Sequence, residues 1–310
     1  MTALLISVTG VASPMAQERD PHLIRQGELS LPEIDRPYKR PKVDKRLPHA
    51  KLVKGRRNVA AVWFSQPSTE YRHDPFGTGE HAKTLMVSTA ERRILRLDLP
   101  RFSVFEDLVP RLADLDGDGR DEVIVVRSRV HRGASLAVVR VLANALVVAA
   151  ETPPLGTPFQ WLNPAGVGDF DGDGKPEIAI VVTPEEEGEL QFWVFHDNRL
   201  ELVASETDVS NHAPGSARLG LSAVADFDGD GIADLAIPDQ QRHTLRFLNM
   251  RGGKIRGLGE RWLPARAQED FEVLEVRGKP AVSVGIAGGR AVIVSPCRDI
   301  PGWQMASGQC

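Results

Sequence analysis

Apolar residues in this chain gather in short runs that are separated by turn-forming residues. The runs EVIVV, SLAVVRVL and ALVVAAE begin at Glu122, Ser135 and Ala145, and EIAIVV, LQFWVF and LELVASE follow from Glu177 onward. Short runs rich in Val, Ile and Leu and bounded by Gly, Pro, Asn or Asp are typical of β-strands. No long stretch shows the period of an amphipathic helix. The pattern therefore predicts an all-β fold.

One segment of the sequence recurs three times. LADLDGDGRDEVIVV begins at Leu112, VGDFDGDGKPEIAIV at Val167 and VADFDGDGIADLAIP at Val224, so the first acids of the copies lie 55 and 57 residues apart. Two weaker copies without the acids, LVKGRRNVAAVWF from Leu52 and LEVRGKPAVSVGI from Leu274, flank them. Four short strands repeated at this period indicate the blades of a β-propeller.

We expect this propeller to span residues 53–296 and to have five four-stranded blades. The last unit supplies three strands, near Phe271, Ala281 and Ala291. Its fourth strand is expected from GELSLPEI, residues Gly27–Ile34, which would close the ring. An open stack of β-units is the alternative to a closed ring.

The recurring segment places acids at alternate positions directly in front of an apolar run. Carboxylates this close repel one another unless a cation lies among them, and Ca²⁺ takes about six to eight oxygen ligands in a flexible shell. Asp side chains would come from the first, third and fifth positions of the loop, a backbone carbonyl from the seventh and a closing acid from the ninth. The three predicted Ca²⁺ sites comprise Asp114, Asp116, Asp118, Arg120 and Glu122; Asp169, Asp171, Asp173, Lys175 and Glu177; and Asp226, Asp228, Asp230, Ile232 and Asp234.

An EF-hand begins with a similar loop, but its later positions differ from those found in this chain. It needs a bidentate Glu at the twelfth position and a helix on each side, whereas apolar residues of strand-like runs stand at that position in all three copies. The second position is also apolar, with Leu115, Phe170 and Phe227 in the three copies. We expect these side chains to point into the blades and anchor the loops.

The D-x-D-G-D-G-x-x-[DE] loops followed by apolar strands resemble the FG-GAP/VCBS repeats of integrin-α-like propellers and of many exported bacterial proteins. LGLSAVADFDGDG from Leu219 and HAPG from His212 look like the Phe-Gly and Gly-Ala-Pro segments of that family, with Leu219 in place of Phe and His212 in place of Gly. The resemblance covers about residues 53–296 and implies Ca²⁺-stabilised blades. The family usually builds about seven blades, so five would be a departure.

The two ends of the chain differ from the repeats. Residues 1–16 resemble a signal peptide, with a short apolar core at Leu4–Val11 followed by small residues. Residues 17–52 form an extended basic arm, and residues 297–310 form a tail. The two cysteines, Cys297 and Cys310, are either paired, as an oxidising compartment would allow, or free thiols. We predict an exported protein, periplasmic or extracellular, without a segment of transmembrane length.

Charge changes this picture little. The chain has a formal net charge of −4, but Arg36–Arg57 holds ten Lys or Arg against one acid. Such an arm attracts anionic partners, or it is simply solvated or in contact with the acidic repeats. Because only Tyr38 offers an aromatic platform there, no specific nucleic-acid partner is expected. The predicted partner is a protein or glycan at the cell envelope, and no oligomeric state is predicted.

One polar insertion, Ser65–Lys83, interrupts the first unit. It holds Tyr71, His73, Asp74, Glu80 and His81, whose spacing is not diagnostic, so a plain loop is expected. Trp161 and His196 are expected to be packing or loop residues.

No catalytic motif is recognised, and we therefore predict a non-enzymatic, Ca²⁺-binding interaction module. The alternative is a propeller enzyme, a lyase or glycosidase, that acts on polysaccharide. A cleft that gathers His73, His81 or further acids away from the acidic loops would favour this alternative.

Overall fold

The computed structural model describes residues 45–308 and 310, which all fall within one compact unit, Pro37–Cys310. Over these residues the chain forms twenty strands, β1 to β20, and one short helix, α1. The prediction of an all-β fold is confirmed. The predicted leader 1–16, the expected ring-closing strand Gly27–Ile34 and most of the basic arm 17–52 lie outside the described residues.

The first sheet contains nine strands and joins two of the predicted units. Its main path runs β1-β2-β3-β5-β7-β8-β9, with β4 paired to β3 and β6 paired to β7. Every pair is antiparallel. The strands are β1 (Val53–Lys54), β2 (Val59–Ser68), β3 (His81–Thr89), β4 (Ile94–Asp98), β5 (Ser103–Phe105), β6 (Arg111–Ala113), β7 (Glu122–Arg129), β8 (Gly133–Val141) and β9 (Leu146–Glu151).

Three smaller antiparallel sheets follow in chain order, with four, four and three strands. The second sheet contains β10 (Leu162–Gly168), β11 (Glu177–Val182), β12 (Glu189–His196) and β13 (Arg199–Thr207). The third contains β14 (Ala223–Ala225), β15 (Asp234–Pro238), β16 (Thr244–Arg251) and β17 (Lys254–Trp262). The fourth contains β18 (Ala267–Val276), β19 (Lys279–Ile286) and β20 (Arg290–Val294), and α1 (Pro296–Asp299) comes after it.

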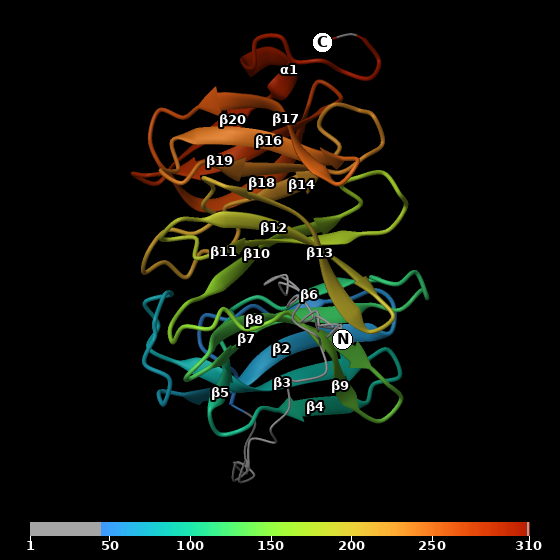
Figure 1. Cartoon of the computed structure of the whole chain (residues 1–310), viewed down its shortest axis with the longest axis vertical. Helices are drawn as coiled ribbons and strands as arrows, with labels where there is room; N and C mark the ends of the chain where they lie inside the picture. The colour runs from blue at the N-terminus through green and yellow to red at the C-terminus, as the bar shows by residue number, and fades with distance from the viewer. Residues whose placement is uncertain (1–44, 309) are drawn as a thin grey trace, which may run out of the picture. The chain divides into compact units, whose positions relative to one another are not determined.

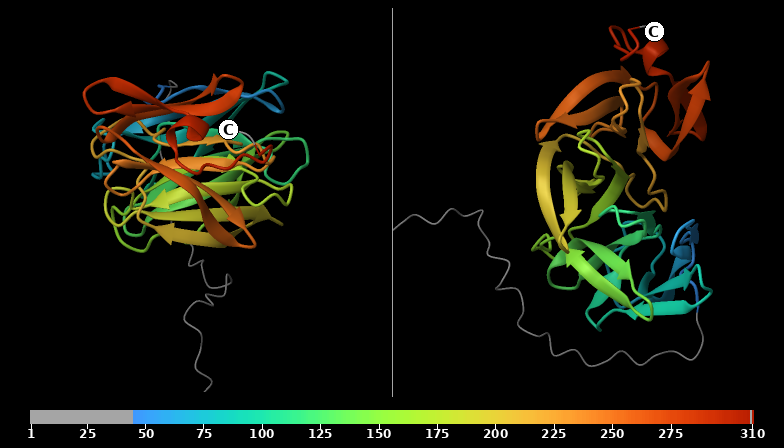
Figure 2. Two further views of the ribbon diagram at one scale, coloured as in Figure 1. Left: turned by 90° about the horizontal axis from the view of Figure 1, so that it is seen from above. Right: turned by 90° about the vertical axis from the view of Figure 1, so that its right-hand side faces the viewer.

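The strands expected from the repeats are confirmed in position. The runs that begin at Glu122 and Glu177 form β7 and β11, and the three strands expected in the last unit are β18, β19 and β20. The sheets follow one another in chain order from the blue end to the red end of the ribbon (Figures 1 and 2). Lys51, just before β1, reaches Asp270 of β18 at 3.2 Å, which links the first and last units. A closed ring of five blades stays a prediction.

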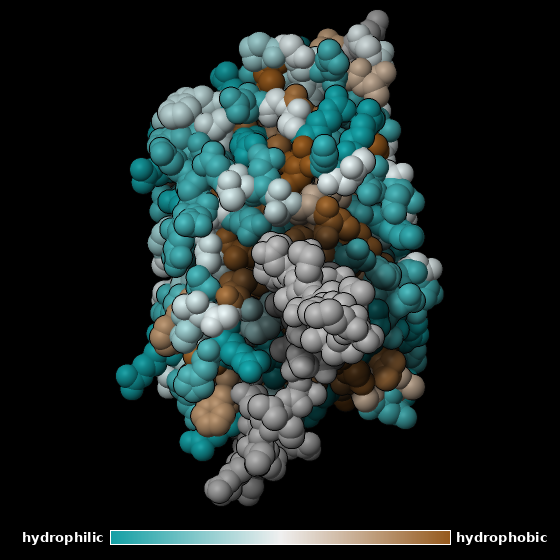
Figure 3. Space-filling model, in the orientation of Figure 1, coloured by the Kyte–Doolittle hydropathy of each residue, from teal (hydrophilic) through white to brown (hydrophobic). Residues whose placement is uncertain are grey.

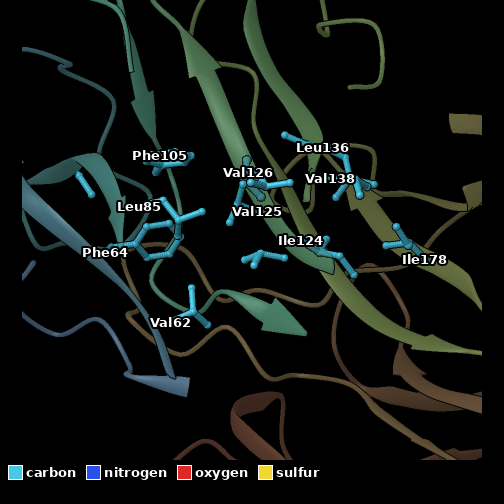
Figure 4. Packing of buried hydrophobic residues seen from close by; sticks show 14 of the residues in the cluster. Val62, Phe64, Leu85, Phe105, Ile124, Val125, Val126, Leu136, Val138 and Ile178 are labelled. Carbon is cyan, nitrogen blue, oxygen red and sulfur yellow. The ribbon is translucent and has the colours of Figure 1, made fainter. Parts of the chain in front are cut away.

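The core lies between the sheets. Strand β7 is buried along its first five residues because both of its faces are covered, and residues 123–126 are accordingly all apolar rather than alternating. In the same cluster Phe64 of β2 packs on Phe105 of β5, with ring centroids 5.4 Å apart, and Ile178 of β11 packs from the next sheet (Figure 4). The face shown in Figure 3 is mostly hydrophilic, with hydrophobic residues along its middle.

Connections between strands lie at two opposite ends of the sheets. The acidic loops connect β6 to β7, β10 to β11 and β14 to β15, at the end where β7 begins with Glu122. The hairpins that connect β7 to β8, β11 to β12 and β15 to β16 lie at the other end of the same strands. We call these the loop end and the hairpin end.

The tail is tied back onto the last sheets. Cys297 and Cys310 form a disulfide, so the paired alternative is confirmed. Trp303 lies edge-on against Phe247 of β16, with ring centroids 5.3 Å apart. In the part of the chain that the structure describes, no helix has the length and apolar character that crossing a membrane requires.

Candidate metal centres

The three acidic loops repeat one hydrogen-bond pattern. In each loop the first Asp accepts a hydrogen bond from the backbone amide of the sixth residue. These bonds run from Gly119 to Asp114 (3.0 Å), from Gly174 to Asp169 (2.9 Å) and from Gly231 to Asp226 (2.9 Å). The sixth residue needs a positive φ, which is 87° at Gly174, and glycine adopts this conformation without strain. The loops therefore fold alike because their glycines occupy the same positions.

The closing acid of each loop binds the backbone at the second position. Glu122 accepts from the amide of Leu115 (3.0 Å), Glu177 from that of Phe170 (2.8 Å), and Asp234 from that of Phe227 (2.8 Å). The second-position side chains are almost completely buried, with exposed fractions of 2%, 0% and 1%. They anchor the loops in the sheets, as the sequence predicts.

Carboxylate oxygens from three residues of each loop lie within 4.8 Å of one another. These sets are Asp114, Asp116 and Glu122; Asp169, Asp171 and Glu177; and Asp226, Asp228 and Asp230. In all three loops the fifth-position acid accepts a hydrogen bond from the amide of the seventh residue, Asp118 from Arg120 and Asp173 from Lys175 at 2.8 Å and Asp230 from Ile232 at 2.9 Å. Asp234 accepts a side-chain bond from Asn249 at 2.9 Å. Each loop thus gathers hard oxygen donors in one small volume.

The donor set fits a divalent cation. Oε1 of Glu177 and Oδ1 of Asp114 are buried and have no hydrogen-bond partner among the described residues. A buried carboxylate oxygen without a partner costs free energy that a bound cation would offset. Hard oxygen ligands of this kind suit Ca²⁺ or Mg²⁺ rather than soft metals.

The raised pKa values of the closing acids also favour a bound cation. Burial raises the pKa of Glu177 to about 7, and the charges of Asp171, Asp169 and Asp173 add to this effect against the hydrogen bond from Phe170. Burial likewise raises the pKa values of Glu122 and Asp234 to about 7. Without a cation, these acids would therefore be partly protonated at neutral pH.

Two arginines distinguish the first loop from the others. Arg140 forms ion pairs with Asp116 and, at 3.6 Å, with Glu122, while Arg57 lies 3.5 Å from Asp114. In the second loop the residue opposite the closing acid is Val194, which carries no charge. Sequence reasoning missed both arginines, because one comes from the preceding unit and the other from the following strand.

Only part of the insertion Ser65–Lys83 is a loop, although a loop is expected over its whole length. Strand β2 extends to Ser68 and β3 begins at His81, so both ends of the insertion belong to strands. Its middle lies at the hairpin end, where Nδ1 of His73 is 2.5 Å from Glu106 and Nε2 of His81 is 2.6 Å from the carbonyl oxygen of His73. Glu106 follows the short strand β5 and was not recognised in the sequence, where it resembles any polar residue that ends an apolar run.

The remaining singled-out residues behave as packing and turn residues. Trp161 is buried, and its indole donates a hydrogen bond to the carbonyl oxygen of Glu106 at 3.0 Å. His196 lies half exposed at the end of β12 and pairs with Glu201 at 3.0 Å.

Comparisons with known proteins identify the repeats. The model of the family described as FG-GAP-like repeat matches residues 114–180 and 169–237. These two overlapping matches contain all three acidic loops, and they confirm the resemblance to FG-GAP repeats over this segment. No curated protein matches the chain.

Among solved structures, the chain is similar to two rhamnogalacturonan lyases. With the exotype lyase YesX it shares 12% identity over 84% of this chain and 60% of that one, at a TM-score of 0.41. With the lyase YesW it shares 14% identity over 67% of this chain and 50% of that one, at a TM-score of 0.39. The chain therefore spans no more than about 60% of the length of either structure.

These comparisons correct one prediction. The sequence predicts that the protein is not an enzyme, and this is contradicted because both solved structures are of enzymes. We therefore do not retain the prediction of a non-enzymatic module.

Proposed function

We propose that this chain, whose residues 114–237 are FG-GAP-like repeats, is an exported β-propeller of five blades that binds Ca²⁺ in its three acidic loops. The observation that carries the proposal is the repeated loop geometry, with a buried, unpartnered carboxylate oxygen in each of the first two loops. A cation bound there would neutralise each cluster and cross-link the start of one strand to the loop before it. Its role would be to stabilise the blades.

The predicted ligands divide into those the geometry supports directly and those that complete the shell. The oxygens that lie together belong to the sets described above, and Ca²⁺ would draw on them first. The carbonyl groups of Arg120, Lys175 and Ile232, with Asp118, Asp173 and Asp234, would complete the six to eight ligands, about the usual number for Ca²⁺.

Export is supported by the disulfide. Structural disulfides persist in oxidising compartments and are rare in the reducing cytosol. The bond between Cys297 and Cys310 therefore favours a periplasmic or extracellular location, where Ca²⁺ is also abundant enough to fill sites of modest affinity.

A second candidate function is an enzyme that acts on polysaccharide. The observation in its favour is a group of ionisable residues at the hairpin end, away from the acidic loops, in which Glu106 holds His73. Carboxylate-held imidazoles are suited to general acid–base work. Rhamnogalacturonan, the substrate named for both similar structures, is the first polymer to test for chain cleavage.

The Ca²⁺ proposal is tested by thermal unfolding in Ca²⁺ and in excess chelator. A ligand at a hundred times its dissociation constant stabilises the folded state by about 2.7 kcal/mol per site. For a domain of this size we expect chelation to lower the Tm by about 5–10 °C or more. Ca²⁺ should restore the Tm, and the bound stoichiometry is measured by calorimetric titration.

The matched variants are Asp171→Asn, in the second loop, and Asp197→Asn, whose side chain is 94% exposed outside the loops. The first should lose part of the Ca²⁺-dependent rise in Tm, and the second should keep all of it. Identical melting curves with Ca²⁺ and with chelator would overturn the proposal.

A further inference from the structure

The hairpin end carries a cluster of histidine and aromatic side chains that the acidic loops do not explain. Strand β7 begins at the loop end with Glu122 and reaches the hairpin end with Ser128, next to Glu106. The segment that connects β2 to β3 brings Tyr71 and His73 to the same place, and the segment before β10 brings Phe159. Residues from three distant parts of the chain therefore meet there.

At its centre a buried carboxylate holds an imidazole. Glu106 is fully buried, and its Oε1 accepts the hydrogen of Nδ1 of His73 at 2.5 Å, while its Oε2 accepts a hydrogen bond from the hydroxyl of Ser128. This contact fixes the orientation of the ring and the tautomer of His73. Nε2 of His73 makes no hydrogen bond among the described residues, and the side chain is 27% exposed. It can therefore exchange a hydrogen bond with a ligand hydroxyl, as the acceptor when the ring is neutral and as the donor when the ring is protonated.

Charge around His73 favours its protonated form. Burial lowers the pKa of His73, but the hydrogen bond and charge of Glu106, with the charges of Glu185 and Asp74, outweigh burial and raise it above its ordinary value. Burial, and then the charge of Glu106, raises the pKa of Tyr71, so this phenol stays protonated. The site accordingly offers a proton-exchanging imidazole beside a neutral hydroxyl.

An exposed aromatic ring lies beside the imidazole. Phe159 is 46% exposed, and its ring centroid lies 5.8 Å from that of His73 and 5.6 Å from that of Tyr71. Its φ is 67°, a backbone conformation that a bulky residue rarely adopts and that only the surrounding structure can maintain. An apolar ring held in this way in water, next to polar groups, is suited to stack on a ligand.

One polar atom in the same cluster is left without a partner. Nδ1 of His81 is buried and has no hydrogen-bond partner among the described residues, whereas the hydroxyl of Tyr71 interacts with Glu106 and Ser128. Tyr71 and His81 are only 3% and 1% exposed, and their rings contact each other at 5.4 Å. Buried polar groups are normally satisfied, so this nitrogen is available for a hydrogen bond from water or from a ligand hydroxyl.

We propose that His73, held by Glu106, and the exposed ring of Phe159 form a carbohydrate-binding subsite that takes a pyranose ring. The apolar C–H face of the sugar would stack on Phe159, and a sugar hydroxyl, which can both accept and donate, would form a hydrogen bond with Nε2 of His73 in either protonation state. A sugar fits because it combines an apolar face with hydroxyl groups, as this site combines an aromatic face with an imidazole. For its choice of ligand alone, the inference rests on the second function proposed above.

The test is a binding titration of the full, Ca²⁺-loaded chain. Rhamnogalacturonan oligosaccharides form one arm, and cello-oligosaccharides and xylo-oligosaccharides form two others, followed by calorimetry and by the NMR signals of the His73 and Phe159 rings. At least one arm is expected to bind and to shift both rings. Failure of all three arms to shift these signals would overturn the proposal.

Variants separate the site from the rest of the molecule. Phe159→Asn removes the ring but keeps a residue that tolerates positive φ, and His73→Gln removes the imidazole. Each is expected to weaken binding about tenfold or more. Phe102→Asn is the control, because Phe102 is exposed to 44%, almost the same fraction as Phe159. Wild-type affinity in Phe159→Asn would contradict the proposal even if His73→Gln failed to fold.

Failure of the sugar-binding subsite can be distinguished from failure of the proposed Ca²⁺ sites or of the proposed enzyme. Ca²⁺ affinity and release of new chain ends from the polymer are measured on the same samples. If the wild-type protein binds Ca²⁺ but none of the sugars, the result counts only against this subsite. Sugar binding without chain cleavage supports the subsite and counts against the enzyme.

Discussion

Single residues make the three acidic loops unequal. Their backbones repeat, but Arg140 and Arg57 bring two positive charges to the first loop, whereas an apolar residue, Val194, stands opposite the closing acid of the second. A guanidinium among the carboxylates supplies part of the neutralisation that a metal ion would otherwise supply, and it repels the ion. We therefore expect the first loop to bind Ca²⁺ most weakly.

The variant Arg140→Val tests this expectation. Replacing the arginine by the residue type found in the second loop should strengthen Ca²⁺ binding at the first loop about tenfold, which is about 1.4 kcal/mol. Calorimetric titration measures the change, and Arg290→Val in β20, outside the acidic loops, is the control. An unchanged or weaker affinity in Arg140→Val would show that Arg140 does not compete with the ion.

At the scale of the element, each acidic loop depends on the strand pair that carries it. Phe170 is fully buried and packs edge-on against Phe192 of β12, with ring centroids 5.0 Å apart. Its backbone amide also binds the closing acid, Glu177. Through this one residue the loop both packs on β12 and is hydrogen-bonded to the first residue of β11.

We predict that Phe170→Ala destabilises the fold by about 3–5 kcal/mol, the usual cost of removing a buried phenylalanine ring. It should also weaken Ca²⁺ binding at the second loop, because the amide of residue 170 would no longer be held in place. Denaturant unfolding measures the first effect. Leu202→Ala, at a position that is 44% exposed, should change stability by less than about 0.5 kcal/mol. A loss below about 1 kcal/mol in Phe170→Ala would refute the anchoring role.

At the scale of the whole molecule, the tail connects the disulfide to the third acidic loop. The amide of Ala306 donates to the carbonyl oxygen of Asp228 at 2.8 Å, and Met305 lies against Gly229. The bond between Cys297 and Cys310, which are 13 residues apart in sequence, holds this segment in place. Redox state and metal binding are therefore expected to be linked in this part of the protein.

Replacing both cysteines by serine should lower stability by about 3 kcal/mol, the order expected for a disulfide that closes a loop of this length. It should also weaken Ca²⁺ binding at the third loop but not at the second. Thermal unfolding and calorimetry of the double variant measure the two effects, with the oxidised wild type as reference. Equal Ca²⁺ affinities in the two proteins would show that the tail does not affect Ca²⁺ binding at the third loop.

Local pattern was sufficient for much of this molecule. The strands β7, β11 and β15, the three acidic loops and the buried second-position anchors follow from the repeated segment, because apolar runs, glycine positions and alternating acids act over a few neighbouring residues. The FG-GAP resemblance is confirmed over residues 114–237 for the same reason.

Contacts between distant segments came only with the folded chain. Arg57 reaches Asp114, Glu106 holds His73, and Ala306 binds Asp228 because strand pairing and sheet packing bring together residues that are far apart in sequence. No local pattern specifies such meetings, since they depend on how whole sheets stack. The acidic loops could therefore be predicted from the sequence, whereas the differences in charge between the loops and the histidine cluster at the hairpin end could not.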